Sequence, residues 1–581
     1  GVWLGEGAEV HPEAHVIGPA VIGDNCRIEA GARIGQYTVL GTNVRVRADA
    51  QLERTVVNDN AYLGEAVRLR GSVIGRACDL RKGVRCEEGV VVGDECFLGE
   101  DALLAAGVKV YPFKTVEAGA TVNDSIVWES RGARSLFGRD GIAGLANVDI
   151  TPEFATKVAM AYGSMLKNGT RVITSRDSSR SARMLKRSMM AGLNAAGVNV
   201  EDLEVASVPV TRFIVRRPSS TGGITIRLVP NDPQSVMIRF FDERGLDITE
   251  DTQRKIERLF NREDFRRVFP GEIGEIGFAP RALEHYATAL EGTVDVDRIR
   301  GAHFKVVIDY AYGSTSFAMS NVLAKLGLEV LAVNPFVSTA GVMRDNLHGH
   351  ADNVADLVRA SGSHLGAVLD PDGERLFLID DEGHLLDDNE ALLAILTLLP
   401  GKIAGDRVAL PVTASEVAAG LVRANGTEVL VTKRSNPALM DASTEAGVGF
   451  AANGEGGFIL PGFMPAFDAA ATFIKVLDLL AFRERRLSDV VAGLPRVHLA
   501  HEVVVTPWEQ KGTVMRSLME QSKDRRVELV DGVKVHHDGG WALALPDPEE
   551  PVTHVWAEGA NDGDARRLAQ EYARRIRQMV R

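Results

Sequence analysis

The stretch AVIGDNCRIEAGARIGQYTVL, residues 20–40, decides the fold of the first part of the chain. An aliphatic residue returns every six positions in it, at Ile22, Ile28, Ile34 and Leu40. A helix repeats about every 3.6 residues and a strand about every 2, so neither produces this period. A solenoid does, because each coil places equivalent residues on each of its faces.

The period continues on both sides of this stretch and slips twice by one residue. Small residues, such as Cys26 and Ala32, stand two positions before many of the aliphatic ones, where a tight corner leaves little room. The pattern resembles the hexapeptide-repeat family and predicts a left-handed parallel β-helix over residues 1–123. The repeat positions are Val10, Val16, Ile22, Ile28, Ile34, Leu40, Val46, Leu52, Val57, Leu63, Leu69, Ile74, Leu80, Cys86, Val92, Leu98, Leu104, Val110, Val116 and Val122.

Two functions are associated with such repeats. Many hexapeptide proteins are acyltransferases, and His11 and His15 are the candidate bases; both lie in the first coil, so we interpret them as surface residues. Similar repeats follow the catalytic domain in many sugar nucleotidyltransferases, where they serve assembly or spacing. The chain starts at Gly1 inside a repeat, which fits a fragment of such a protein, and nucleotidyltransferase activity would require a catalytic domain upstream.

The composition sets the class of protein. The 581 residues exceed what one core can organise, and 45% hydrophobic with 25% charged residues is ordinary for globular domains. The net charge of −13 disfavours a nucleic-acid partner. We find no apolar run of the roughly 20 residues that a membrane helix needs and no signal peptide, so we expect a cytoplasmic protein without a membrane partner. The cysteines lack CxxC spacing and are interpreted as buried thiols.

Beyond residue 135 the pattern changes to alternating strands and helices. Strands are predicted at 171–174, 305–310, 328–333, 365–369, 408–412 and 428–432, with helices between them. Successive βαβ units predict parallel sheets with right-handed crossovers, and ligand sites at the loops that follow the strands.

The most acidic of these loops is LDPDGERLFLIDDEG, residues 369–383. Asp370, Asp372 and Glu374 follow a short strand and surround Gly373, and closely spaced carboxylates can gather around a cation such as magnesium. The spacing alone favours a simpler interpretation, a β-hairpin turn, for which Asp and Gly are the expected residues.

Three segments together resemble the phosphohexomutase family. FGRDGIAG (137–144) is similar to the family's FGTDGIRG, residues 175–203 resemble the helix and strand that follow it, and LDPDGERL (369–376) is similar to the DPDGDR metal loop. The resemblance implies a four-domain α/β/α architecture over residues 137–297, 298–398, 399–498 and 499–581, after a linker at 124–136.

Members of that family move a phosphate between the 1 and 6 positions of a hexose through a phosphoserine, with magnesium beside it. The resemblance therefore implies that magnesium is bound by Asp370, Asp372 and Glu374. It also implies a hexose phosphate partner, with Arg239, Arg375 and Glu455 as the substrate-binding residues.

Four family motifs depart from the pattern. Against GGIMITASHNPxxxNGIKFF stands GGITIRLVPNDPQSVMIRFF, residues 222–241, and we interpret Arg227 as occupying the serine position, which leaves no catalytic residue. The phosphate clamp RPSGTEP corresponds to LPDPEEP, residues 545–551, in which carboxylates replace hydroxyl donors and repel phosphate. The remaining departures are Ala143 in the opening motif and Phe458 in NGEGGF, residues 453–458, against the sugar-reading GEESGH.

From these observations we expect a phosphohexomutase-like module that lacks ordinary mutase activity. It would act as a sugar-phosphate-binding regulatory or scaffold region in a nucleotide-sugar protein of the mannose-1-phosphate guanylyltransferase type. The alternative is an active phosphomannomutase or phosphoglucomutase with another phosphate carrier, and a hexapeptide acyltransferase is less favoured. We also expect a homo-oligomer.

Overall fold

The computed structural model describes residues 1–123, 125–126, 131–132, 136–230, 232–338, 347–401, 405–548 and 550–580. They divide into two compact units. The first contains Gly1–Gly138, Ile142–Phe154 and Arg254–Asp264, and the second contains Arg139–Gly141, Ala155–Gln253 and Phe265–Arg581.

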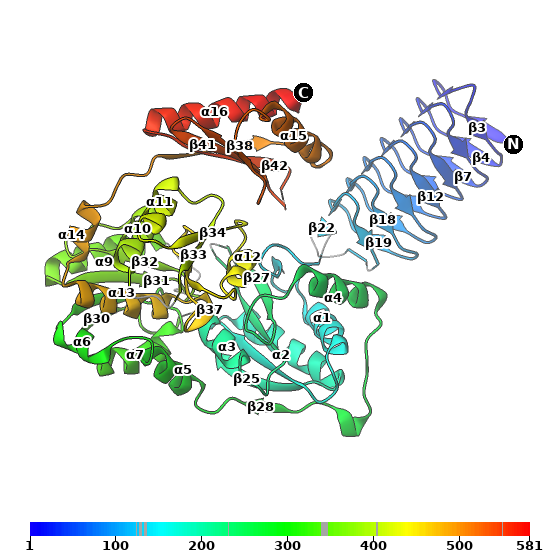
Figure 1. Ribbon diagram of the computed structural model, residues 1–581. Coiled ribbons are helices and arrows are strands. Elements are labelled where there is room, and N and C mark those ends of the chain that lie inside the picture. Colours follow the sequence, from blue (N-terminus) through cyan, green and yellow to red (C-terminus); the bar gives the residue numbers. More distant parts are fainter. Residues whose placement is uncertain are drawn as a thin grey trace. The chain divides into compact units, whose positions relative to one another are not determined.

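The first unit contains a left-handed parallel β-helix, whose short strands stack coil upon coil into three sheets among the described residues (Figure 1). Sheet A contains β1 (Val2–Leu4), β4 (Ala20–Ile22), β7 (Thr38–Leu40), β10 (Val56–Val57), β13 (Val73–Ile74), β16 (Val91–Val92) and β19 (Lys109–Val110). Sheet B contains β2 (Glu9–Val10), β5 (Arg27–Ile28), β8 (Arg45–Val46), β11 (Tyr62–Leu63), β14 (Asp79–Leu80), β17 (Phe97–Leu98), β20 (Thr115–Val116) and β22 (Arg131–Gly132). Sheet C contains β3 (His15–Val16), β6 (Arg33–Ile34), β9 (Gln51–Glu53), β12 (Arg68–Arg70), β15 (Arg85–Cys86), β18 (Leu103–Leu104) and β21 (Thr121–Val122).

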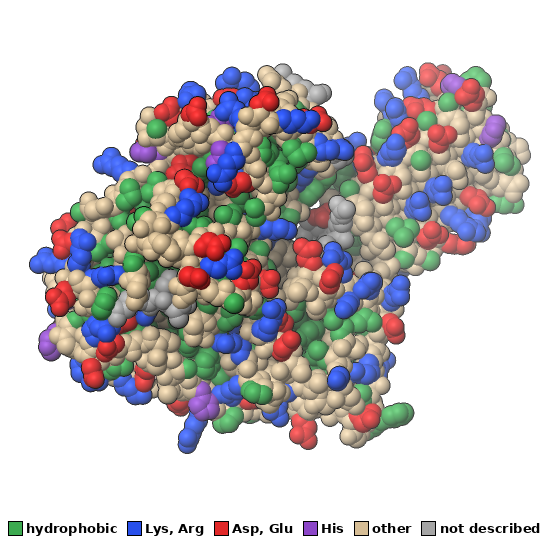
Figure 2. Space-filling model, viewed as in Figure 1, with side chains coloured by type: hydrophobic (Ala, Val, Ile, Leu, Met, Phe, Trp, Pro, Cys, Tyr) green, Lys and Arg blue, Asp and Glu red, His purple; other side chains and the backbone are tan. Residues whose placement is uncertain are grey.

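The six-residue period explains the interior of this solenoid. From Ile22 to Val122, the repeat positions lie inside as one column per sheet, and all of them are buried. A fully buried aliphatic side chain stabilises the fold by about 1.5–3 kcal/mol, so the repeats hold one another in place. All four cysteines are free and buried in the same interior, as predicted. Figure 2 shows charged side chains of both signs on the visible face of the β-helix.

The predicted linker, residues 124–136, lies largely outside the described residues. Its described part includes β22, which extends sheet B by pairing in parallel with β20. The boundaries of the five predicted domains stay a prediction.

The second unit begins with a mixed sheet in the order β27-β26-β24-β25-β28. Strands β24, β25, β26 and β28 run parallel, and β27 returns antiparallel to β26 as a hairpin. The bounds are β24 (Arg171–Arg176), β25 (Asn199–Val205), β26 (Gly222–Val229), β27 (Asp232–Phe241), β28 (Ile276–Phe278), α1 (Pro152–Met165), α2 (Arg180–Ala195), α3 (Val208–Val215), α5 (Ala282–Glu291) and α6 (Val296–Gly301). Most of α4 (Glu250–Arg262) belongs to the first unit.

The next two sheets have the orders β30-β29-β31-β32 and β34-β33-β35-β36-β37. In each, the first three strands are parallel and a hairpin adds antiparallel strands at one edge. The bounds are β29 (Lys305–Asp309), α7 (Thr315–Lys325), β30 (Glu329–Val333), α9 (Leu347–Ser361), β31 (Leu365–Leu369), β32 (Leu376–Ile379), α10 (Asp388–Leu398), β33 (Arg407–Pro411), α11 (Glu416–Ala424), β34 (Glu428–Thr432), α12 (Asn436–Ala442), β35 (Val448–Ala452), β36 (Phe458–Leu460), β37 (Met464–Phe467), α13 (Ala469–Arg483) and α14 (Leu487–Ala492).

The last sheet, in the order β38-β42-β41-β40-β39, is antiparallel throughout. The βαβ units predicted from the sequence are parallel, whereas this sheet and the hairpin edges of the others are antiparallel, because tight turns and not helical crossovers join neighbouring strands there. The bounds are β38 (Leu499–Val505), α15 (Trp508–Gln521), β39 (Val527–Glu528), β40 (Val533–His537), β41 (Gly540–Pro546), β42 (Val552–Glu558) and α16 (Asp562–Met579). In the described part of the chain, no helix combines the length and apolar character needed to cross a bilayer.

Candidate functional site

The acidic loop that follows β31 forms a tight turn built around Gly373. The N–H of Gly373 donates to the carbonyl oxygen of Asp370 at 3.0 Å, and its φ of +80° lies in the left-handed region. A Cβ at this position would lie 2.6 Å from Thr315 Oγ1 and 3.2 Å from Ser207 Cβ. Glycine is therefore required both by the backbone conformation and by the close approach of α7 and the residue before α3.

Asp370 turns its carboxylate back into this loop. Its Oδ1 accepts hydrogen bonds from the backbone N–H groups of Glu374 at 2.8 Å and Arg375 at 3.0 Å. Burial, followed by the charge of Asp372, raises the pKa of Asp370 to about 7. The carboxyl group thus shapes the turn and takes up a proton easily near neutral pH.

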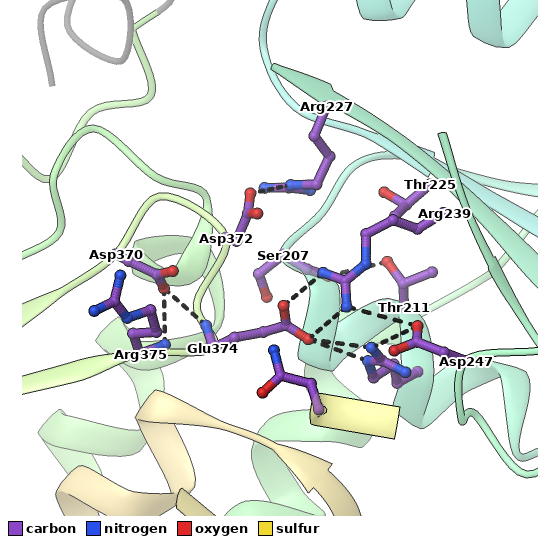
Figure 3. Close-up of polar contacts among 12 residues, drawn as sticks. Ser207, Thr211, Thr225, Arg227, Arg239, Asp247, Asp370, Asp372, Glu374 and Arg375 are labelled. Carbon is purple, nitrogen blue, oxygen red and sulfur yellow. Dashed lines mark hydrogen bonds and ion pairs between the residues drawn. The ribbon is translucent and has the colours of Figure 1, made fainter. Parts of the chain in front are cut away.

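Asp372 is paired with Arg227, which lies near the end of β26 (Figure 3). The guanidinium group also donates to the carbonyl oxygens of Ala206 at 2.9 Å and Pro371 at 3.2 Å. Arg227 is 2% exposed. A buried cation with a hydrogen bond from each of its three nitrogens therefore binds the loop directly.

Glu374 is held by two further arginines. Its Oε2 lies 2.6 Å from Arg239 Nη1, and its Oε1 lies 3.3 Å from Arg212 Nη2. Asp247 joins the group at 3.0 Å from Arg212 and 3.6 Å from Arg239. Burial raises the pKa of Glu374, but the charges of Arg239 and Arg212 outweigh it, so the pKa is below its ordinary value.

The local folding explains why these arginines converge. Arg239 pairs with Thr225 across the β26–β27 hairpin. Arg227 follows Thr225 by two positions on β26, so their side chains lie on the same face of the sheet. Arg212 comes from α3, whose first N–H, on Val208, donates to the carbonyl oxygen of Asp372 at 3.0 Å. Figure 3 shows the side chains of Arg227 and Arg239 directed at the loop.

These residues do not fit a magnesium ion as they are arranged. Asp370 accepts backbone N–H groups, while the other two predicted ligands are engaged by arginine. Among the described residues, no group of three or more His, Cys, Asp or Glu side chains is placed to hold a metal. The predicted magnesium site therefore finds no donor set here, because guanidinium groups neutralise the carboxylates that a cation would need.

A position-by-position count corrects the residue assigned to the serine position. Counted position by position, the serine of the family segment falls opposite Val229, and the threonine two positions before it falls opposite Arg227. Val229 ends β26 where the pairing shifts, at the start of the turn, whereas Arg227 lies within the paired strand. Neither side chain has a hydroxyl group, so the absence of the family's serine still holds.

The other two predicted substrate residues meet at the backbone. Arg375 Nε donates to the carbonyl oxygen of Glu455 at 2.8 Å, and the Glu455 carboxylate lies 2.6 Å from Arg434. In the same loop Phe458 is 2% exposed and packs on Phe450 with ring centroids 6.2 Å apart. The residue that replaces the family's histidine is therefore part of the core.

The loop that corresponds to the phosphate clamp is stabilised by its own contacts. Leu545 is buried in an apolar cluster with Trp541, and Asp547 pairs with Arg139 at 2.9 Å and with His554 at 3.2 Å. Lys511 donates to the carbonyl oxygen of Asp547 at 2.5 Å. Glu549 lies outside the described residues. The cations near this loop thus contact its own acidic and carbonyl groups.

A pocket of about 170 Å³ lies beside the end of β26 and the acidic loop. Its carboxylates outnumber its guanidinium groups, which disfavours a phosphate dianion. The polar lining consists of Asp177, Ser178, Arg227, Asp232, Tyr312, Ser314, Asp370, Asp372 and Arg375.

Sequence motifs missed Arg212 and Asp247. Arg212 is fully buried in the otherwise apolar segment VPVTRFIV, residues 208–215. A charged residue inside an apolar helix was the available signal, because such a residue must have a partner.

Comparison with family models now places these elements. Residues 134–267 match "Phosphoglucomutase/phosphomannomutase, alpha/beta/alpha domain I", and residues 284–383 match domain II of the same family. Residues 134–267 and 284–383 are thus similar to phosphoglucomutase/phosphomannomutase domains I and II. Residues 3–127, the β-helix, match the "GMPPB C-terminal domain".

Relatives extend the phosphoglucomutase/phosphomannomutase similarity beyond these two domains. The phosphoglucomutase/phosphomannomutase of Thermococcus kodakarensis is 27% identical over 442 residues, which cover 74% of this chain and 96% of that protein. The phosphoglucosamine mutase of Methanocaldococcus jannaschii is 24% identical over 449 residues, covering 76% and 98%. A solved phosphoglucomutase/phosphomannomutase family structure from Burkholderia thailandensis matches with a TM-score of 0.68 and 21% identity, covering 77% and 98%. The α/β region has a mutase-like fold.

Proposed function

We propose that this chain is a phosphohexomutase-like module that does not transfer phosphate and that serves a regulatory or scaffold role in a nucleotide-sugar protein. The observation that carries the proposal is that three arginines form ion pairs with the carboxylates of the acidic loop. Arg227 pairs with Asp372, while Arg239 and Arg212 pair with Glu374.

Transfer of a phosphoryl group through the protein requires a hydroxyl nucleophile, a cation on its phosphate, and donors for the substrate's second phosphate. Val229 provides no hydroxyl, the loop carboxylates already have arginine partners, and Asp547 places negative charge in the clamp loop. Three different segments of the chain therefore each lack one of the three required groups.

The pocket supports binding more than chemistry. Its acidic and hydroxyl groups match the hydroxyl groups of a hexose, which can both donate and accept hydrogen bonds. A hexose phosphate would therefore be held chiefly through the sugar. The similarity of residues 3–127 to the GMPPB C-terminal domain supports a place in nucleotide-sugar synthesis of the mannose-1-phosphate guanylyltransferase type.

An active phosphomannomutase or phosphoglucomutase is the second candidate. It is favoured by relatives that carry mutase names and align over about three quarters of the chain. This candidate requires a phosphate carrier other than the family's serine.

One experiment separates the two candidates. The full chain is incubated with mannose 6-phosphate or glucose 6-phosphate, magnesium and the matching hexose 1,6-bisphosphate, and phosphorus NMR follows the 1-phosphate. We expect no conversion above that of heat-denatured protein, while calorimetry detects binding of the 6-phosphate if the module is regulatory. Conversion that disappears in Asp370→Asn or Asp372→Asn would establish the mutase and overturn the proposal.

A further inference from the structure

One face of the β-helix has a continuous apolar row on its outside. The row is formed by the outward residues of successive strands of sheet A, which pair directly with one another. We call it the valine ladder. Its members, with their exposed fractions, are Trp3 (56%), Val21 (38%), Val39 (38%), Val56 (38%), Val73 (38%) and Val91 (39%).

The other two sheets are built differently at the same outward positions. Sheet B presents Arg27 and Arg45, and sheet C presents Arg33, Arg68 and Arg85, and all five are exposed. An apolar outer row is therefore a property of this one face and not of the coil geometry. Exposed valines stabilise neighbouring strands, but that reason applies equally to all three sheets.

We propose that the valine ladder is the surface through which two copies of this chain associate. A flat row of near-identical side chains, repeated at about 4.8 Å per coil, is complementary to the same row rotated by a two-fold axis. The chain's net charge of −13 opposes association at most surfaces, but the ladder residues are uncharged.

Trp3 and Lys109, two outward residues of the same sheet, favour an antiparallel arrangement. After Val91 the next outward residue is Lys109, which pairs with it and is exposed. Two copies docked antiparallel bring Lys109 of each copy to Trp3 of the other, where an ammonium group can lie against the indole ring. The two-fold axis then passes beside Val56, which is three coils from Trp3 and three coils from Lys109.

The size of the surface sets the strength of the association. From Trp3 to Lys109 there are six inter-coil steps, which span about 29 Å. A standard interface buries about 800 Å² per partner, more than six partly exposed side chains supply. We therefore expect a dimer that dissociates on dilution.

Sedimentation equilibrium of the full chain over a range of concentrations tests the association. We expect a monomer–dimer equilibrium whose dissociation constant rises at least tenfold in Val56→Glu. The matched control Thr115→Glu adds the same charge at an exposed outward position of β20 in sheet B and leaves the equilibrium unchanged. Val39→Thr nearly preserves the shape of the side chain, so it should fold normally. It should weaken the dimer less than Val56→Glu does. A monomer at all concentrations, or an equilibrium that Val56→Glu leaves unaltered, overturns the proposal.

Cross-linking with a short bismaleimide tests the antiparallel geometry. We expect Val56→Cys to cross-link to itself, and Val21→Cys to cross-link only when mixed with Val91→Cys. Thr115→Cys is the control, and the native cysteines are buried. Self-cross-linking of Val21→Cys, or equal cross-linking of Val56→Cys and Thr115→Cys, contradicts the two-fold arrangement.

Discussion

Replacing Glu374 with glutamine removes the charge that holds Arg239 and Arg212 at the acidic loop. The Glu374 side chain is 13% exposed, and those of the two arginines are 9% and 0% exposed, so the group is shielded from water. Breaking a buried ion pair costs about 3–5 kcal/mol. Because Asp247 still contacts both arginines, we expect the lower end, about 3 kcal/mol.

Hydrogen exchange of peptides that cover residues 222–241 measures this loss. A change of about 3 kcal/mol corresponds to roughly 150-fold faster exchange at pH 7. The pKa of Glu374 is below its ordinary value, so its stabilisation is complete above the unfolded value of about 4.3 and is lost as the pH falls through the lower folded value. The difference in stabilisation free energy between the wild type and the variant, as measured by hydrogen exchange, should thus be the same at pH 7 and at pH 5.5.

The control is Asp297→Asn, which removes an exposed pair with Arg300 and should change local exchange less than about threefold. If Glu374→Gln behaves like this control, the arginines do not stabilise the loop and the reasoning about the site is refuted.

Three further outcomes follow from the geometry. Gly373→Ala should lower stability by more than about 2 kcal/mol, because its Cβ meets Thr315 at a positive φ; Gly362→Ala, with positive φ but open space, should cost about 1 kcal/mol in the same urea titration. Burial and the charges of His554 and Arg434 lower the pKa of His501 to about 4, so NMR should find its ring neutral at pH 5.5. Its contribution to stability should fall as the pH drops from about 6.5 towards 4. Titration of the ring near pH 6.5 would contradict this prediction. Burial raises the pKa of Cys86 to about 12, so mass spectrometry should find it unmodified by N-ethylmaleimide in the native protein and modified in urea.

Much of the fold could be predicted because its signals are local. The six-residue period depends on residues within one coil, and the predicted strands at 365–369 and 428–432 coincide with β31 and β34. The hairpin at the acidic loop was predicted from its spacing, since β31 and β32 pair antiparallel around it, but the other antiparallel edges were missed because a hairpin and a crossover begin with the same kind of strand.

The site was predicted less completely because its partners are distant in sequence. Arg212 and Glu374 are separated by 162 residues, and motif reading of the loops does not connect them. The sequence places the acidic loop directly after a strand, as the structure has it, but the chemistry of the loop depends on which side chains reach it. The same holds for Asp547, whose pairing with Arg139 spans 408 residues.

The absence of a phosphate carrier is the central claim, and intact-mass analysis after incubation with mannose or glucose 1,6-bisphosphate and magnesium tests it most directly. We predict that the mass of the wild-type chain stays unchanged. We predict an unchanged mass for Val229→Ser as well. Arg227 would still form its ion pair with Asp372, so this carboxylate would not be available to a cation beside the new hydroxyl group. Addition of one phosphoryl group to the wild-type chain, lost in Asp372→Asn, would contradict the account.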